Sequence, residues 1–232
     1  MQWKVPRIWE GGRCIVIGGG PSILRQFDVP NHVIQSVYSG QSSPVVYSPY
    51  LQPIHGEHVI GVNMAMKFGS WVDVLFFGDG GFWNRHRDDI MDFQGLRVTT
   101  SKKAHEAVPN NRRIKYLKVN SKVHGLCLQP TSLCWNLNSG AAAINLAVLF
   151  GVKQVILLGF DMKLDESVNQ HWHKFYKSNP KTVKGTFKMH MKAFPAILED
   201  AKPLGVEIIN ANPDSEIPDF RKVPIKELIK NK

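Results

Sequence analysis

Apolar residues in this chain gather in short continuous runs that are separated by polar segments. Continuous apolar runs are typical of strands that are buried on both faces, as in a parallel sheet covered by helices. The pattern predicts strands at 13–18, 58–63, 72–79, 96–101, 154–161 and 206–212, and a weaker edge strand at 114–119.

Helical patterns lie between several of these runs. The clearest one spans 139–151, where Ser139 can cap the first turn and Gly151 can end the helix. Residues 186–205 also have a helical pattern, but Pro195 within them predicts a kink or a break. Shorter helices are predicted at 64–69 and 82–93.

The alternation of strands and helices predicts one α/β domain over residues 1–232, built on a single doubly wound, mostly parallel, Rossmann-like sheet. Two segments stand outside this alternation. Residues 31–56 are rich in Ser, Pro and Tyr, and we expect them to form a loop insertion. Residues 162–185 are polar, basic and aromatic. Because they follow the strongest strand, we expect them to form a mobile lid over the site.

The composition is that of a globular protein, because 43% of the 232 residues are hydrophobic. No apolar run reaches the length of a membrane span, and the first residues lack the apolar segment of a signal peptide. The three cysteines have no metal-binding spacing. An odd number of cysteines without a signal segment predicts a reducing, cytoplasmic location.

The chain is basic, with a net charge of +10. The basic residues concentrate at 97–103, 112–118, 174–188 and 221–232. One interpretation is a basic face that binds a polyanion such as nucleic acid. The other is that the charge attracts a nucleotide substrate and keeps the protein soluble. We favour the second interpretation because no nucleic-acid-binding motif accompanies the charge.

Three glycines end the first predicted strand, at Gly18, Gly19 and Gly20, and Pro21 and Ser22 follow them. Glycines allow a sharp turn and a close approach, and proline suits the first turn of a helix. The free N–H groups of such a turn favour an anion, so the stretch predicts a cradle for a phosphate or a nucleotide. The alternative is a tight strand-to-helix turn without a ligand. The dinucleotide-binding fingerprint G-x-G-x-x-G is disfavoured, because isoleucine occupies the position of its last glycine.

Polar residues also stand at the carboxyl ends of other predicted strands, and these ends meet in one crevice of a doubly wound sheet. Asn63 is a candidate to bind a nucleobase edge, a ribose hydroxyl or a phosphate, or to form a turn. Asp79 is a candidate ligand of Mg²⁺ or of a sugar hydroxyl, or a helix cap. Asp161, two residues after Gly159, offers the same choice between ligand binding and a turn or cap.

The helix predicted at 139 begins with Asn138, Ser139 and Gly140, which can hold a phosphate or simply cap the helix. In the predicted lid, His171 and His173 would face the same side of an extended segment. Either is a candidate general base, because imidazole titrates near physiological pH. A pair of histidines can also bind a metal, although no third ligand is near in the sequence. Lys174, Lys177 and Lys181 are candidates to neutralise phosphates as the lid closes.

The order of these motifs resembles two related families. GGGPS, GVN, NSG at a helix start, LLGFD and a histidine in the following loop are similar in order to bacterial sialyltransferases that use a cytidine-monophosphate sugar. They are also similar to the 6-hydroxymethyl-dihydropterin pyrophosphokinase-like family, which includes phage and motility-associated proteins. The resemblance extends from about residue 13 to residue 212.

The sialyltransferase resemblance implies a glycosyltransferase that takes a CMP- or NDP-sugar and transfers the sugar to a hydroxyl acceptor. It implies that the donor is bound by Gly18 to Ser22, Asn63, Asn138 to Gly140, Gly159 and Asp161. It also implies that His171 or His173 is the base and that no metal or other cofactor is required.

The pyrophosphokinase resemblance implies ATP- and Mg²⁺-dependent pyrophosphoryl transfer to a hydroxymethyl heterocycle, with Asp79 and Asp161 as metal ligands. A third hypothesis is a non-enzymatic, phage-type protein that binds a nucleotide or nucleic acid. Because members of these families often form oligomers, a homo-oligomer is a further expectation.

Overall fold

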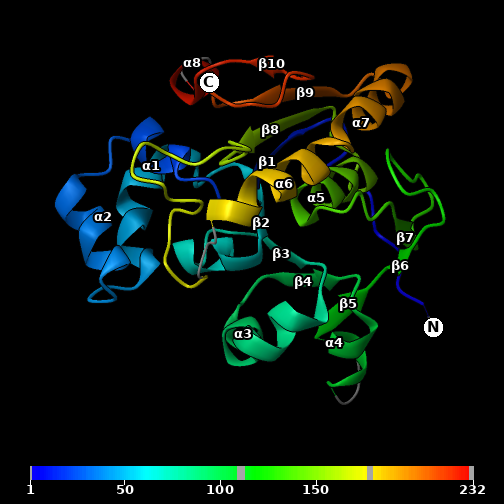
Figure 1. Ribbon diagram of the computed structural model, residues 1–232. Coiled ribbons are helices and arrows are strands. Elements are labelled where there is room, and N and C mark those ends of the chain that lie inside the picture. The colour runs from blue at the N-terminus through cyan, green and yellow to red at the C-terminus, as the bar shows by residue number, and fades with distance from the viewer. Residues whose placement is uncertain (1, 109–112, 177–179, 230–232) are drawn as a thin grey trace.

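The computed structural model describes residues 2–108, 113–176 and 180–229, the side chains of 180 and 181 excepted. Within these residues, eight strands form one sheet in the order β10-β9-β8-β1-β2-β3-β4-β5, and all neighbours are parallel (Figure 1). The strands of this sheet are β1 (Arg13–Ile17), β2 (His58–Val62), β3 (Val74–Phe77), β4 (Leu96–Thr99), β5 (Ile114–Tyr116), β8 (Gln154–Leu158), β9 (Glu207–Asn210) and β10 (Arg221–Lys222). The predicted α/β fold with a mostly parallel sheet is confirmed.

Helices connect the strands and cover both faces of the sheet. The α-helices are α1 (Ser22–Gln26), α2 (Asn31–Tyr38), α3 (Gly80–Asp92), α4 (Lys102–Glu106), α5 (Ser139–Leu149), α6 (Pro180–Met191), α7 (Phe194–Ala201) and α8 (Ile225–Ile229). The 3-10 helices are η1 (Pro44–Ile54), η2 (Asn63–Phe68) and η3 (Lys202–Leu204), and a separate ribbon pairs β6 (Lys118–Val119) with β7 (Ser132–Leu133).

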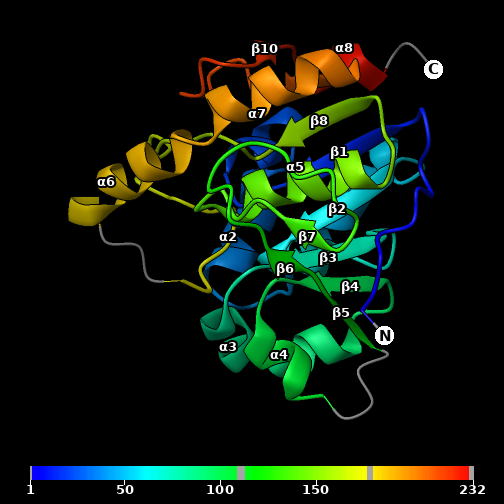
Figure 2. The ribbon, with the colours of Figure 1, turned by 90° about the vertical axis from the view of Figure 1, so that its right-hand side faces the viewer.

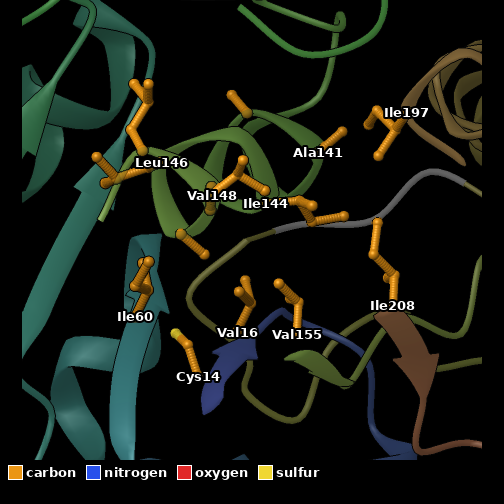
Figure 3. Packing of buried hydrophobic residues seen from close by; sticks show 14 of the residues in the cluster. Cys14, Val16, Ile60, Ala141, Ile144, Leu146, Val148, Val155, Ile197 and Ile208 are labelled. Carbon is orange, nitrogen blue, oxygen red and sulfur yellow. The ribbon is translucent and has the colours of Figure 1, made fainter. Parts of the chain in front are cut away.

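The core lies in two layers because alternate side chains of each strand point to opposite faces. On one face, Val16 of β1, Ile60 of β2 and Val155 of β8 point toward Ile144 of α5 (Figure 3). Helix α7 covers the same face beside α5 (Figure 2). On the other face, Ile15 packs in a second cluster with residues of α1, α2, α3, α4, η1 and η2. The continuous apolar runs in the sequence follow from this double coverage.

The segment 31–56 is not the predicted loop insertion. It forms α2 and η1, and its apolar side chains Val37, Tyr47, Leu51 and Ile54 are buried in the second cluster. Pro49 and Pro53 inside η1 prevent a regular α-helix, but proline is compatible with short turns of 3-10 helix. The segment therefore forms part of the helical layer of the domain.

Two other local predictions, the edge strand at 114–119 and the end of the lid, differ in part from the structure, and the predicted break in 186–205 is confirmed. The run 114–119 splits, because β5 belongs to the large sheet and β6 to the ribbon. The predicted break in 186–205 is confirmed, since α6 ends at Met191 and α7 begins at Phe194 with Pro195 in its first turn. Helix α6 begins already at Pro180, so the end of the predicted lid is helical, and α6 projects from the body (Figure 2). Among the described residues, no helix combines the length and the apolar character needed to cross a membrane.

Candidate functional site

The order in which the chain adds strands to the sheet reverses between β1 and β8. The chain adds β2 to β5 on one side of β1 and then returns to place β8 on its other side. Such a switch point opens a crevice at the carboxyl ends of the strands. A cavity of about 340 Å³ lies there. Its walls come from the ends of β1, β2, β3 and β8, the start of α5, the segment 170–176 and α6.

Most residues that the sequence singled out line this cavity. They are Gly18, Gly19, Gly20, Asn63, Asp79, Asn138, Ser139, Gly140, Gly159, Asp161, His171 and His173. Pro21 and Ser22 lie just behind it, at the start of α1. The expectation that the strand ends bring these residues together is therefore met.

The glycines at the end of β1 are required by neighbouring protein atoms. A Cβ atom on Gly18 would lie 2.7 Å from the carbonyl oxygen of Gly159. A Cβ atom on Gly20 would lie 2.5 Å from the carboxyl carbon of Asp161. Both distances are too short for real contacts, so these glycines allow the ends of β1 and β8 to touch.

Asp161 accepts hydrogen bonds from the protein where the ends of β1 and β8 meet. Its Oδ2 accepts from the backbone N–H of Ser22 at 2.9 Å, and its Oδ1 accepts from the Ser22 hydroxyl and from Asn212 Nδ2. Burial raises the pKa of Asp161, and the hydrogen bonds from Ser22 and Asn212 oppose that rise. The N–H group of the first turn of α1 thus meets a protein carboxylate.

The remaining N–H groups of the glycine loop are largely occupied as well. Gly18 donates to the Leu158 carbonyl at 2.8 Å, and Gly20 donates to the Gly159 carbonyl at 2.9 Å. Within the described part of the chain, the Gly19 N–H has no acceptor. An anion at this loop would therefore meet one free backbone donor of the glycine loop, not the several free N–H groups that the sequence predicts.

Asp79 caps α3, because its Oδ1 accepts from the backbone N–H of Phe82 at 2.6 Å. The pyrophosphokinase resemblance assigns both Asp79 and Asp161 to Mg²⁺. Both oxygens of Asp161 are engaged, and no group of three or more His, Cys, Asp or Glu side chains in the described residues is arranged to hold a metal.

The cap of α5 is Asn138 and not Ser139. Asn138 Oδ1 accepts from the N–H of Gly140 at 2.8 Å and from that of Ala141 at 3.4 Å. Within the described residues, this leaves Asn138 Nδ2 buried and without a partner. Asn63 follows β2 as the first residue of η2, with a φ of 53°, and its buried Oδ1 has no partner in the described part of the chain.

Trp172 fixes the histidine segment to the glycine loop. Its backbone N–H donates to the Gly19 carbonyl and its indole N–H to the Gly18 carbonyl, each at 3.0 Å. The indole is fully buried, and its ring centroid lies 4.2 Å from that of Phe68 in η2. Tyr38 of α2 donates its hydroxyl to the His171 carbonyl at 3.0 Å. This part of the predicted lid is packed as a wall of the cavity.

His171 and His173 stack on each other beside Tyr176. Their ring centroids lie 5.1 Å apart with 6° between the planes. Burial lowers the pKa of His171 to about 4 and that of His173 to about 2, so both imidazoles are neutral at pH 7. His173 Nδ1 accepts from the backbone N–H of Phe175 at 3.3 Å, which places the proton of this ring on Nε2.

Of the lysines that the sequence assigned to phosphate, Lys174 does not line the cavity. Lys174 donates to Asn169 and lies 4.6 Å from the ring centroid of Tyr38. Lys177 and the side chain of Lys181 are outside the described residues. The lysine that lines the cavity is Lys163, which forms no ion pair with any described residue.

The cavity also has residues that the sequence analysis did not select: Trp135, Leu137, Tyr176, Phe187 and His190. Four of its lining residues hold buried polar atoms that have no partner among the described residues: Asn63 Oδ1, Asn138 Nδ2, His171 Nδ1 and the Tyr176 hydroxyl. Buried polar groups are normally hydrogen-bonded, because leaving one unpaired costs about 1–3 kcal/mol. Their convergence indicates a site for a polar ligand.

Comparisons with known proteins concern the fold. Neither a family model nor a curated protein matches the sequence. A structure of the sialyltransferase CstII from Campylobacter jejuni with cytidine-5'-monophosphate aligns over 97% of this chain and 86% of that chain, at 12% identity and a TM-score of 0.48. The MAf glycosyltransferase from Magnetospirillum magneticum AMB-1 aligns over 97% of this chain and 36% of that chain, at 9% identity and a TM-score of 0.59. The chain thus shares an α/β fold with a region of the MAf glycosyltransferase.

Proposed function

We propose that this protein is a glycosyltransferase that binds a nucleotide-activated sugar in the cavity and transfers the sugar to a hydroxyl group. The observation that carries the proposal is the set of four buried, unpartnered polar atoms at the carboxyl ends of a parallel sheet. The fold shared with the MAf glycosyltransferase is compatible with it. CstII structures contain CMP, which makes a CMP-sugar the first donor to test.

The donor would be held by a hydrogen-bond acceptor, a hydrogen-bond donor and groups that favour negative charge. Asn63 offers a free carbonyl oxygen to a hydroxyl or an amino group of the nucleotide, and Asn138 offers a free NH₂ group to an oxygen. The start of α5 favours negative charge because of the helix dipole. Lys163 adds the positive charge of a side chain without an ion pair. These groups suit a phosphate with a single negative charge, and we assign no metal to it.

His171 is the better candidate for the base. His173 is 3% exposed and its Nδ1 lone pair is engaged by Phe175. His171 is less buried, and its Nδ1 forms no hydrogen bond of acceptable geometry within the described residues, although the Gly19 backbone beside the ring acts to raise its pKa. The unprotonated nitrogen of His171 would accept the proton of the acceptor hydroxyl. The hydroxyl oxygen would then bond to the anomeric carbon while the bond from that carbon to the phosphate oxygen breaks. The electron pair of that bond would leave with the nucleotide phosphate.

A pKa of about 4 makes His171 available but weakly basic at pH 7. An anionic donor beside the ring would raise this pKa, because a negative charge within a few ångströms favours the imidazolium. The donor would therefore increase the basicity of His171 as it binds. His173, stacked on His171, would hold the ring in place as a positioning residue.

A thermal-shift panel tests the proposal. We would measure the melting temperature with CMP, CDP, UDP, GDP, ADP and ATP, each with Mg²⁺ and with EDTA, because a ligand of the native state raises it. We expect one mono- or diphosphate to raise it without a metal. The shift should be lost in Asn63→Ala and kept in Asn31→Ala, an exposed asparagine of α2 that serves as the matched control. No shift with any nucleotide would refute the proposal, and a shift with ATP and Mg²⁺ alone would replace glycosyl transfer by pyrophosphoryl transfer.

A further inference from the structure

Trp135 lies at the edge of the cavity, over the end of β3. A Cβ atom on Gly78 would lie 2.0 Å from its indole ring, so the ring rests directly on the glycine backbone. Trp135 and Leu137 both line the cavity, and Trp135 is half-buried. An aromatic ring is thus fixed with part of its surface open to the space where a ligand would bind.

The backbone after Trp135 is held in a strained conformation. Asn136 and Leu137 have φ angles of 57° and 52°, in the left-handed region that residues other than glycine rarely adopt. Leu137 has no polar side chain to offset this strain. Backbone strain of this kind costs about 1–3 kcal/mol for each residue and persists where the surroundings impose it.

Asn136 supplies that constraint. It is fully buried, its Oδ1 accepts from the Gly125 N–H at 2.8 Å, and its Nδ2 donates to the Gly125 carbonyl at 3.1 Å. From the middle of α5, Asn145 accepts from the N–H of Cys127 and from that of Cys134. The loop that presents Trp135 is therefore tied on both sides of the indole, which indicates a preorganised surface.

In the part of the chain that the structure describes, Trp135 and Trp3 differ from the other four tryptophans in what they contact. Trp9, Trp71 and Trp172 each stack or pack against another ring, and Trp83 lies under an arginine. Within the described residues, Trp135 has neither a ring partner nor an acceptor for its indole N–H. Its exposed face is available to a planar group.

We propose that Trp135 is the stacking platform for the nucleobase of the donor. The proposal rests on the proposed function and assigns a subsite within the same cavity. A nucleobase fits better than a saturated sugar ring, because it is flat and its edge carries both hydrogen-bond donors and acceptors. Asn63 Oδ1 and Asn138 Nδ2 offer one unpaired acceptor and one unpaired donor in the same cavity. Stacking supplies affinity, and the two amides read the edge of the base.

Calorimetric titration of the wild type and two variants tests this assignment. CMP, UMP, GMP and AMP would each be titrated into the wild type, Trp135→Leu and Trp135→Phe, with ribose 5-phosphate as the ligand without a base. Leucine keeps apolar contact with Gly78 but removes the aromatic face, and phenylalanine keeps an aromatic face. We expect Trp135→Leu to weaken the preferred nucleotide roughly 5- to 100-fold, as for the loss of one base stack. Trp135→Phe should weaken it only a few fold, and ribose 5-phosphate should bind all three proteins alike.

Trp3→Leu is the matched control, because Trp3 is also half-buried but does not line the cavity. It should bind the nucleotide like the wild type. If Trp135→Leu binds the nucleotide as tightly as the wild type does, or loses ribose 5-phosphate to the same extent, the stacking assignment is wrong although the proposed function stands. If no nucleotide binds the wild type, the proposed function fails and the assignment fails with it. Urea midpoints of all variants would show that each is folded.

Discussion

The buried histidines predict a specific loss of stability in acid. In the unfolded chain, His171 takes up a proton near its ordinary pKa of 6.5, whereas in the folded protein burial lowers that pKa to about 4. Between these values the unfolded state binds more protons than the folded state. The stability is therefore complete above pH 6.5 and is lost as the pH falls toward 4.

The size of the stability loss follows from the difference between the two pKa values of His171. Each unit of pKa shift corresponds to about 1.4 kcal/mol, so at pH 5 the neutral His171 destabilises the folded state by about 2 kcal/mol relative to pH 7. His173 contributes in the same direction, because its pKa is lowered to about 2. The variant His171→Gln removes one of these groups and should lose about 2 kcal/mol less than the wild type between the two pH values.

The assay is urea denaturation of wild type and His171→Gln at pH 7 and pH 5. For each protein, the free energy of unfolding at pH 5 is subtracted from that at pH 7. Any change that the substitution makes equally at both pH values then cancels. Asn63→Ala is the control, because it alters the same cavity without removing a titrating group, and it should keep the wild-type loss. An identical loss in wild type and His171→Gln would show that His171 is not buried as neutral imidazole, and the reasoning about the base would fail with it.

Three substitutions at the site and one control in α6 test the packing around the site. Gly20→Ala should lower the free energy of unfolding, measured by urea denaturation, by about 1–3 kcal/mol, because its Cβ would meet Asp161 at 2.5 Å. A Cβ on Gly185 in α6 would have no atom within 4 Å, so Gly185→Ala should be neutral or stabilising by about 0.5–1 kcal/mol in the same measurement. Trp172→Phe removes the indole N–H that bonds to the glycine loop and should cost about 1–3 kcal/mol in the same measurement, and an unchanged midpoint would contradict the anchoring role. Asp161→Asn presents an NH₂ group to donors from Ser22 and should cost about 1–3 kcal/mol at pH 7, so a neutral effect would mean that the carboxylate is not the acceptor.

The fold was predictable from the sequence because both faces of the sheet are buried. That burial produces the continuous apolar runs, and the carboxyl ends of parallel strands must meet on one side. Asn63, Asp79 and Asp161 could therefore be grouped without knowing a single contact. In the segment 31–56, the prolines of η1 interrupt the apolar spacing, whereas the helical spacing of Val33 and Val37 in α2 was present in the sequence and was not used.

The roles of individual site residues depend on contacts that the sequence does not contain. Glycines at a strand end are compatible with a ligand or with a neighbouring strand, and here the neighbours Gly159 and Asp161 account for them. Trp135 and Lys163 lie on loops whose paths are set by distant partners such as Gly125. An aromatic residue three positions before the cap of α5 was the available signal for Trp135.

The most direct test of the central claim is release of nucleotide from sugar nucleotides, measured by chromatography with water or an added sugar as the acceptor. Wild type would be incubated in EDTA with CMP-sialic acid and with UDP- and GDP-sugars. The account predicts that one donor is consumed, that the bare nucleotide appears, and that His171→Ala reduces the rate strongly while His173→Asn reduces it less. If no donor is consumed, or if His171→Ala is as active as the wild type, the cavity is not the active site of a glycosyltransferase that uses this histidine as its base.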